Sequence, residues 1–264
     1  MPKSGTPPVG RGSGPAALLL IVGCLVAIGL ARPLAPGGPR SGGHVAVPAR
    51  SAVSRTDRLA ARPPMAGADG VQRRLGGRTR AVALTFDDGP DPRWTPAVLD
   101  LLRRYHTQAT FCLVGEHAVE HPELVRRIAI DGHALCDHTW SHDEALPGRS
   151  AATIRAEITR TYDAIVAASG GIRPRYYRAP AGRWSPAELA DARRLGLRPL
   201  GWSVDPADWR RPPAALITRR VLAGAVPGAI VLLHDGYGDR AATLAALPEI
   251  LPALAGRHLA TTVP

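Results

Sequence analysis

Short apolar runs alternate with amphipathic segments through the second two-thirds of the chain. Runs of strand length occur at Ala81–Phe86, Ala109–Val114, His133–Cys136, Leu200–Val204, Ala229–Leu233 and Leu259–Val263. Apolar residues recur at helical spacing within Val98–Tyr105, Pro122–Ile130 and Ile154–Val166. Strands that alternate with helices predict a parallel α/β fold, either an open sheet or a barrel. In both architectures, functional side chains lie at the carboxyl ends of the strands.

Local signals mark where two of the helices begin. Pro96 directly follows Thr95, and proline is favoured in the first turn of a helix. Ser185-Pro186-Ala187-Glu188 is a capping box with proline at the first helical position, and it predicts a helix that ends near Gly196.

The N-terminal part of the chain has a different pattern. Ala16–Ala31 is an unbroken run of 16 residues without a polar side chain, and Lys3 and Arg11 precede it. A basic segment followed by an apolar run is typical of an export signal, although a membrane span needs roughly 20 residues. We predict that residues 1–31 are a signal peptide or a membrane anchor, and that the protein is secreted or membrane-anchored with its catalytic domain outside the cytoplasm. Three fates of this segment stay open: cleavage, retention in the membrane as an anchor, and lipidation at Cys24.

Charge separates this front part from the remainder of the chain. The 264 residues carry a formal net charge of +11, which by itself suggests a nucleic-acid binder. However, residues 1–78 hold 11 basic and two acidic side chains, whereas residues 79–264 hold 22 basic and 20 acidic ones. Residues 32–78, rich in Pro, Gly and Arg, predict a disordered basic linker that lies along an anionic cell envelope. We therefore expect no nucleic-acid partner.

Five polar motifs follow predicted strands or lie at their ends. They are Thr85-Phe86-Asp87-Asp88-Gly89-Pro90, His138-Thr139-Trp140-Ser141-His142, Arg178-Ala179-Pro180-Ala181-Gly182, Asp205-Pro206-Ala207-Asp208-Trp209 and Leu232-Leu233-His234-Asp235. Taken singly, each also fits a turn, a surface histidine pair, a surface cation or a loop acid. A carboxylate with two histidines is a metal-ligand set, which a non-haem iron oxygenase also uses, but the H-x-D spacing of such an enzyme is absent.

Together and in this order, the five motifs resemble the NodB-type polysaccharide deacetylases, also called carbohydrate esterase family 4, over about residues 80–264. The resemblance implies an α/β fold, a single distorted (β/α) barrel of about seven parallel strands, which we assign to residues 79–264. It also implies a polysaccharide substrate and, we expect, a monomer. The membrane is a further partner if the apolar segment is not cleaved.

The resemblance implies one divalent metal ion, held by Asp88, His138 and His142. This set leaves coordination positions open for water and substrate, as a hydrolytic metal requires. Zinc is the expected ion from the ligand types, with cobalt, nickel and manganese as alternatives.

Catalytic roles are likewise carried over from the family. Asp87 corresponds to the general base and Arg178 to the arginine that orients it. His234 corresponds to the general acid, with Asp205 as its expected charge partner.

The pocket residues implied by the resemblance are Ala181, Trp209 and Leu232. The backbone N–H of Ala181 would hold the oxyanion, although the family commonly has an aromatic residue at this position. Trp209 and Leu232 would form the walls around the acetyl methyl group. Trp140, Trp184 and Tyr237 are weaker candidates for stacking on sugar rings, with core packing as the alternative for each.

The implied reaction is metal-dependent hydrolysis of N-acetyl groups on a polymer that contains N-acetylglucosamine, either peptidoglycan or a chitin-type chain. The alternatives are O-deacetylation of acetylated xylan by the same site, and an inactive sugar-binding relative. We expect Cys112 and Cys136 to be buried free thiols, with a disulfide between them as the alternative.

Overall fold

The computed structural model describes residues 67–264. Seven parallel strands form the sheet, in the order β5-β4-β3-β2-β1-β6, and β7 pairs with the start of β1. The strands are β1 (Ala81–Asp87), β2 (Thr110–Leu113), β3 (Ala134–Asp137), β4 (Tyr176–Tyr177), β5 (Arg198–Pro199), β6 (Ile230–His234) and β7 (Ala260–Thr261). The predicted parallel α/β barrel of about seven strands is confirmed.

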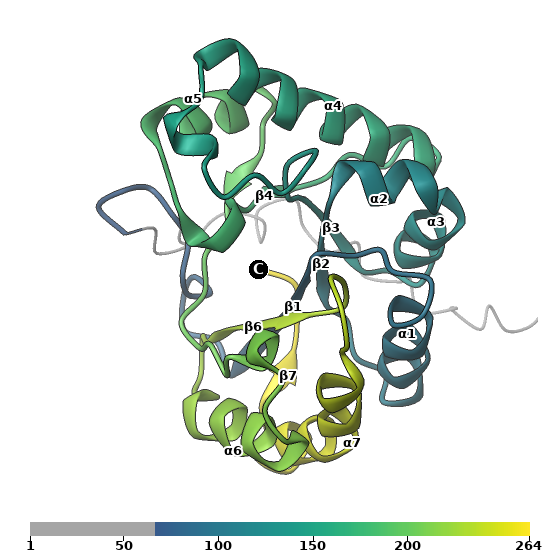
Figure 1. The fold of residues 1–264 in the computed structure, drawn as a ribbon. Coiled ribbons are helices and arrows are strands. Elements are labelled where there is room, and N and C mark those ends of the chain that lie inside the picture. The colour runs from purple at the N-terminus through teal and green to yellow at the C-terminus, as the bar shows by residue number, and fades with distance from the viewer. Residues whose placement is uncertain (1–66) are drawn as a thin grey trace, which may run out of the picture. The chain divides into compact units, whose positions relative to one another are not determined.

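Within residues 67–264, seven α-helices connect the strands and lie outside the curved sheet (Figure 1). They are α1 (Thr95–Arg104), α2 (Gly115–Glu120), α3 (Pro122–Ile130), α4 (Ala151–Ser169), α5 (Pro186–Arg194), α6 (Ala214–Gly224) and α7 (Ala241–Gly256). The capping box forms as predicted: the Ser185 hydroxyl accepts a hydrogen bond from the Glu188 N–H at 3.2 Å and donates one to its carboxylate at 2.6 Å.

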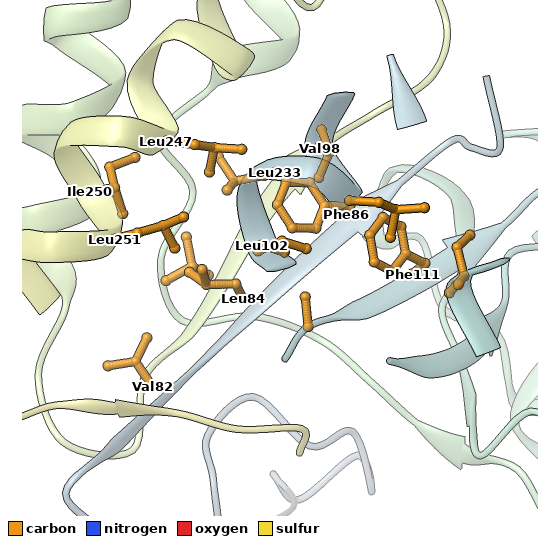
Figure 2. Close-up of a cluster of buried hydrophobic side chains, with 14 of the residues drawn as sticks. Val82, Leu84, Phe86, Val98, Leu102, Phe111, Leu233, Leu247, Ile250 and Leu251 are labelled. Carbon is orange, nitrogen blue, oxygen red and sulfur yellow. The ribbon is translucent and has the colours of Figure 1, made fainter. Parts of the chain in front are cut away.

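The alternation of side chains along β1 decides which residues face the helices. Val82, Leu84 and Phe86 point outward into the buried cluster that includes Leu102 of α1 and Leu247 of α7, and Figure 2 shows Leu84 and Phe86 beside Leu102. The intervening residues therefore face the inside of the barrel, so Thr85 and Asp87 lie on the inner side of the sheet. Burial of the outward face fixes the register of β1 and thereby keeps the Asp87 side chain on the inner face.

Strand pairing brings the motifs to one edge. Asp87 at the end of β1 is the register partner of His234 at the end of β6 and of Cys112 in β2. Cys112 is in turn paired with Cys136 in β3, two residues before His138. All of these strands are parallel, so the segments that follow them meet at the carboxyl edge of the sheet.

The expectation of free thiols is wrong, because Cys112 and Cys136 form a disulfide. They are register partners on neighbouring strands, and their Cα atoms lie 4.2 Å apart. Sequence alone shows both residues in buried strands but not that the two strands are adjacent.

One predicted strand is also wrong. Regular pairing covers β5 at Arg198–Pro199 only, and the predicted segment Leu200–Val204 contributes isolated bridges from Leu200 to Gln72 and from Val204 to Val231. Between these bridges the chain leaves the sheet, and the Gly201 N–H bonds to the Gln72 carbonyl. Four elements had no prediction: α2, β4, α6 and α7.

The folded part begins before residue 79. Val71 is fully buried, Gln72 bridges to Leu200, and Arg74 bridges to Ala229. The assignment of residues 67–78 to a disordered linker is therefore wrong. The predicted signal or anchor at residues 1–31 and the rest of the linker lie outside the described residues. Within residues 67–264, no helix combines the length and the hydropathy that a membrane span requires.

Candidate metal-dependent active site

The five motifs meet at one cleft of about 390 Å³ at the carboxyl edge of the sheet. Nine of the ten predicted site residues line it: Asp87, Asp88, His138, His142, Ala181, Asp205, Trp209, Leu232 and His234. The tenth, Arg178, is fully buried and contacts Asp87. Glu144, Arg183 and Trp202 line the cleft as well and had no prediction.

Asp88, His138 and His142 form a cluster that can hold a metal ion. One ligand atom from each residue lies within 4.8 Å of the other two. The Nε2 atoms of His138 and His142 are 3.6 and 3.4 Å from Asp88 Oδ1. That oxygen is buried and has no hydrogen-bond partner among the described residues, which is costly unless a ligand satisfies it. The donor set and its orphaned oxygen therefore fit a divalent cation.

Hydrogen bonds orient this cluster. His138 Nδ1 lies 2.8 Å from the Arg178 carbonyl oxygen, which leaves Nε2 directed at Asp88. Such a bond to the second ring nitrogen fixes a metal-binding histidine in its tautomer and orientation. Asp88 and His142 have φ values of 77° and 54°, a region that side-chain-bearing residues rarely adopt. Backbone strain at both residues thus accompanies the convergence of the three side chains.

The surroundings of Asp88 and His142 favour their deprotonated forms, which are the forms that bind a metal ion. Burial opposes ionisation of Asp88, but the imidazole of His138, 3.6 Å from Oδ1, and the charges of the nearby histidines lower the pKa of Asp88 to about 2. Burial and the charge of His138 lower the pKa of His142. Burial also disfavours the charged form of His138, but Asp87 and Asp88 outweigh it and raise its pKa. A cation bound by the same atoms would compete with that proton.

Arg178 holds Asp87 in place. Its Nη1 lies 2.5 Å from Asp87 Oδ1 and donates to the Thr85 hydroxyl at 2.9 Å, and its Nε donates to the Leu200 carbonyl at 2.9 Å. The contact with Arg178 occupies Oδ1 of the Asp87 carboxylate, while the other oxygen, Oδ2, lies 3.6 Å from His138 Nε2. Asp87 is thus oriented beside the candidate metal site with one oxygen free of the arginine.

The charge partner of His234 is Asp208, and the prediction of Asp205 is wrong. His234 Nδ1 is 2.7 Å from Asp208 Oδ1, and the His234 N–H donates to Oδ2 at 2.9 Å. Asp208 begins a short 3-10 turn, Asp208–Arg210, that directs its carboxylate inward. Asp205 is exposed, and its Oδ1 accepts from the Ala207 N–H at 2.7 Å. The motif contains both acids, and its spacing does not show which one turns inward.

Asp208 changes the acidity of His234. Burial favours the neutral imidazole, but the hydrogen bond and charge of Asp208 outweigh it and raise the pKa of His234 to about 9. The imidazolium form therefore persists at neutral pH, as a general acid requires.

Ala181, Trp209 and Leu232 line the cleft. Ala181 has φ 52° within the turn Pro180–Gly182, Leu232 is buried, and Trp209 keeps 45% of its surface exposed. The ring of Trp202 packs against Gly182, where a Cβ atom would lie only 2.7 Å from Cη2. The glycine is required by this close approach, and Trp202 completes the wall beside the Ala181 turn.

The three aromatic candidates for sugar stacking separate into two groups. Trp140 lies under the Arg160 guanidinium, 3.8 Å from the ring centroid, and Trp184 packs edge-on against Tyr177. Neither lines the cleft. Tyr237 keeps 41% of its surface exposed and lies beside His142, with ring centroids 5.4 Å apart.

Known proteins resemble this chain in sequence and in fold. A family model described as polysaccharide deacetylase matches residues 75–200. A chitooligosaccharide deacetylase of Rhizobium leguminosarum bv. trifolii is 42% identical over 193 residues, which covers 69% of this chain and 89% of the relative.

Solved structures of polysaccharide deacetylases and carbohydrate esterases are also similar to this chain. A peptidoglycan N-acetylglucosamine deacetylase crystallised with a naphthalenyl N-hydroxybenzamide aligns with TM-score 0.69 and 34% identity, over 72% of this chain and 89% of that one. A family 4 carbohydrate esterase from Streptomyces lividans, in complex with acetate, aligns with TM-score 0.64 and 34% identity, over 69% and 91% of the two chains. The chain belongs to the NodB-type polysaccharide deacetylases, carbohydrate esterase family 4.

Proposed function

We propose that this protein hydrolyses the N-acetyl groups of N-acetylglucosamine units in a polysaccharide and releases acetate. One observation carries the proposal: two oriented proton-transfer groups face the same cleft as the candidate metal site. Asp87 is held by Arg178 at 2.5 Å, and His234 is held by Asp208 at 2.7 Å. A hydrolase needs such a pair, one group to accept a proton and one to donate it.

Asp88, His138 and His142 would hold the divalent ion, and we propose zinc, because one carboxylate and two imidazoles suit it. Cobalt, nickel and manganese accept the same donors. When bound, the ion supplies Lewis-acid polarisation of a carbonyl and lowers the pKa of a coordinated water.

Asp87 acts as the general base. Its carboxylate lies at the end of β1 next to Asp88, so it is within reach of water at the candidate metal site. It accepts a proton as the water oxygen bonds to the acetyl carbon. Arg178 occupies Oδ1 and thereby keeps the other oxygen available for this transfer.

His234 acts as the general acid. As the carbon–nitrogen bond breaks, the imidazolium donates its proton to the leaving nitrogen, and the products are acetate and a free amine. The hydrogen bond of Nδ1 to Asp208 leaves Nε2 as the donating atom. The backbone N–H of Ala181 stabilises the negative oxygen that develops on the acetyl carbonyl, and Leu232 and Trp209 enclose the methyl group.

The names of the relatives support peptidoglycan and chitin-type oligomers as the substrate class. The relatives include both chitooligosaccharide deacetylases and peptidoglycan N-acetylglucosamine deacetylases. Acetate release from chitotetraose, peptidoglycan and acetylated xylan, assayed side by side, tests the proposal. We expect release from at least one of the first two to exceed release from xylan, and release from xylan alone would show O-deacetylation instead.

We further propose that the catalytic domain works outside the cytoplasm, with residues 1–31 as signal or anchor and residues 32–66 as a basic tether to the anionic envelope. Deletion of residues 32–66 tests the tether, because the cut leaves the described residues 67–264 intact. We expect less protein in the cell-wall fraction at low salt, and an unchanged fraction would refute it.

A further inference from the structure

The strands begin at the edge of the sheet opposite the candidate active site, and the segments that lead into them form a second face of the molecule. All seven strands are parallel, so their starts lie at one edge and their carboxyl ends at the other. We define the amino face by the segments at the strand starts: residues 78–80, 105–109, 130–133, 170–175, 195–198, 225–229 and 256–259.

Shared clefts connect neighbouring segments of the amino face. His106 lines one cleft together with His258 and another together with His133. Segments 170–175 and 195–198 line a third cleft, of about 440 Å³. Segments that are far apart in the sequence therefore share one surface.

The amino face is strongly basic. It holds six arginines and a single acidic side chain, Asp131, which is already paired with Arg103 and Arg127. Within residues 67–264, none of the six arginines forms an ion pair with a carboxylate side chain. All six are exposed: Arg78, Arg80, Arg173, Arg175, Arg198 and Arg257.

The opposite edge of the sheet has no such excess of positive charge. The loops that join β1–β6 to the helices after them hold eight acidic and seven basic side chains. Residues 79–264 as a whole are also nearly balanced, with 22 basic and 20 acidic side chains. The basicity of the catalytic domain is thus concentrated on the amino face, where it produces a local positive potential.

Exposed aliphatic side chains lie among these arginines. The strongly exposed large aliphatic residues within residues 67–264 are Val119, Ile130, Ile172 and Val226. Three of the four belong to the amino face: Ile130, Ile172 and Val226 are 76%, 48% and 44% exposed. Basic and aliphatic side chains together suit an anionic lipid surface, because cations attract the phosphates while apolar groups enter the boundary between headgroups and acyl chains. A soluble polyanion would leave the aliphatic side chains without a partner.

We propose that the amino face docks on an anionic lipid surface, with its arginines at the headgroups and Ile130, Ile172 and Val226 at the acyl boundary. Docked in this way, the candidate active site at the opposite edge faces away from the lipid and stays open to a polymer. The inference goes beyond the proposed function, and it depends neither on acetate release nor on the fate of residues 1–31.

The test asks whether a tryptophan placed on the amino face contacts lipid. The full chain with Ile172→Trp is mixed with vesicles of equal parts brominated phosphatidylcholine and phosphatidylglycerol, because brominated chains quench an indole only at short range. Val119→Trp is the matched control, since Val119 is exposed to 58% and lies in α2, outside the amino face. The five native tryptophans are common to both variants. We expect quenching beyond that of the native chain for Ile172→Trp and none for Val119→Trp.

A second pair of variants tests the arginines. Arg173→Gln/Arg175→Gln, added to Ile172→Trp, should raise the lipid concentration at half-maximal quenching about tenfold. Arg126→Gln/Arg219→Gln removes two exposed arginines from α3 and α6, away from the amino face, and should leave that concentration unchanged.

Three results would overturn the proposal. The first is equal quenching of Ile172→Trp and Val119→Trp, or quenching of neither. The second is undiminished quenching of Ile172→Trp by vesicles of brominated phosphatidylcholine alone, because the surface would then not need to be anionic. The third is binding of soluble polyphosphate that Arg173→Gln/Arg175→Gln weakens, without any quenching by vesicles, which would assign the amino face to a soluble polyanion instead.

Discussion

The carboxylate of Asp208 engages His234 twice, through Nδ1 of the ring at 2.7 Å and through the backbone N–H at 2.9 Å. A third contact, from the Thr243 hydroxyl at 2.8 Å, fixes Asp208 itself. The arrangement sets both the orientation of the imidazole and its charge, because Asp208 outweighs burial in determining the pKa of His234. It is the part of the site from which pH behaviour can be predicted most directly.

Asp208→Asn should shift the alkaline limb of the pH–rate profile to lower pH. In the native protein the pKa of His234 is raised to about 9, so the acid form is present below that value and is lost above it. The substitution removes the charge that raises the pKa, so the acid form is lost earlier. We also expect kcat to fall by about 100-fold. Measurement of kcat/KM against pH checks both effects.

Asp205→Asn is the matched control for this prediction, because it removes a carboxylate from the same motif without touching His234. The alkaline limb of the Asp205→Asn pH–rate profile should lie at the same pH as that of the native protein. An Asp208→Asn profile that overlays the native one would mean that His234 is not the titrating acid.

Asp87→Asn should separate catalysis from metal binding. The amide keeps the shape of the side chain but cannot accept the proton, so turnover should fall by about 10²–10⁴-fold. Zinc affinity, measured by calorimetry, should stay within a few-fold because Asp88, His138 and His142 are untouched. Substantial residual turnover would remove Asp87 from the role of base.

His138→Ala should remove the metal. His138 supplies one of three ligand atoms and is itself oriented by the Arg178 carbonyl at 2.8 Å. We expect no zinc binding at micromolar metal, measured on protein dialysed free of ions. His133→Ala, a buried histidine at the other end of β3, is the control and should retain the ion. Tight binding by His138→Ala would exclude it as a ligand.

Reduction of the Cys112–Cys136 disulfide should destabilise the fold. The bond joins β2 to β3 and closes a loop with a sequence separation of 24, for which chain entropy suggests about 3 kcal/mol. Thermal unfolding with and without reductant measures the loss, and Cys112→Ala/Cys136→Ala should show no response to reductant. Alkylation of both thiols in the unreduced native protein would contradict the bond.

Sequence patterns identified the strands that are long and well bounded. β1 and β6 were predicted to within one residue at each end because their apolar runs stop at charged motifs. β4 spans only Tyr176–Tyr177, too short for any periodicity. Helix α7 contains Pro248 and Pro252, residues that normally interrupt a helix, and its strongly apolar composition hides its helical spacing.

The sequence predicted the motifs that form the site, but it did not show which of their side chains pair with one another. The choice between Asp205 and Asp208 depends on Ala207, whose left-handed backbone (φ 56°) precedes the turn that directs Asp208 inward. The disulfide depends on the adjacency of β2 and β3, which is tertiary information. Trp202, His117 and Arg240 lie outside the five motifs, and they become visible only when their contacts with Gly182, Asp88 and Tyr237 are known.

Release of acetate from an N-acetylglucosamine polymer should require a metal held by Asp88, His138 and His142. Acetate release from chitotetraose and from peptidoglycan should be measured with the zinc-loaded protein, after exhaustive chelation, and after zinc is restored. We expect acetate release by the loaded protein from at least one of the two substrates, loss of about 99% of it or more on chelation because the Lewis acid is removed, and recovery with zinc. Undiminished acetate release from chelated protein that retains less than about one metal ion per hundred molecules would show that the reaction needs no metal.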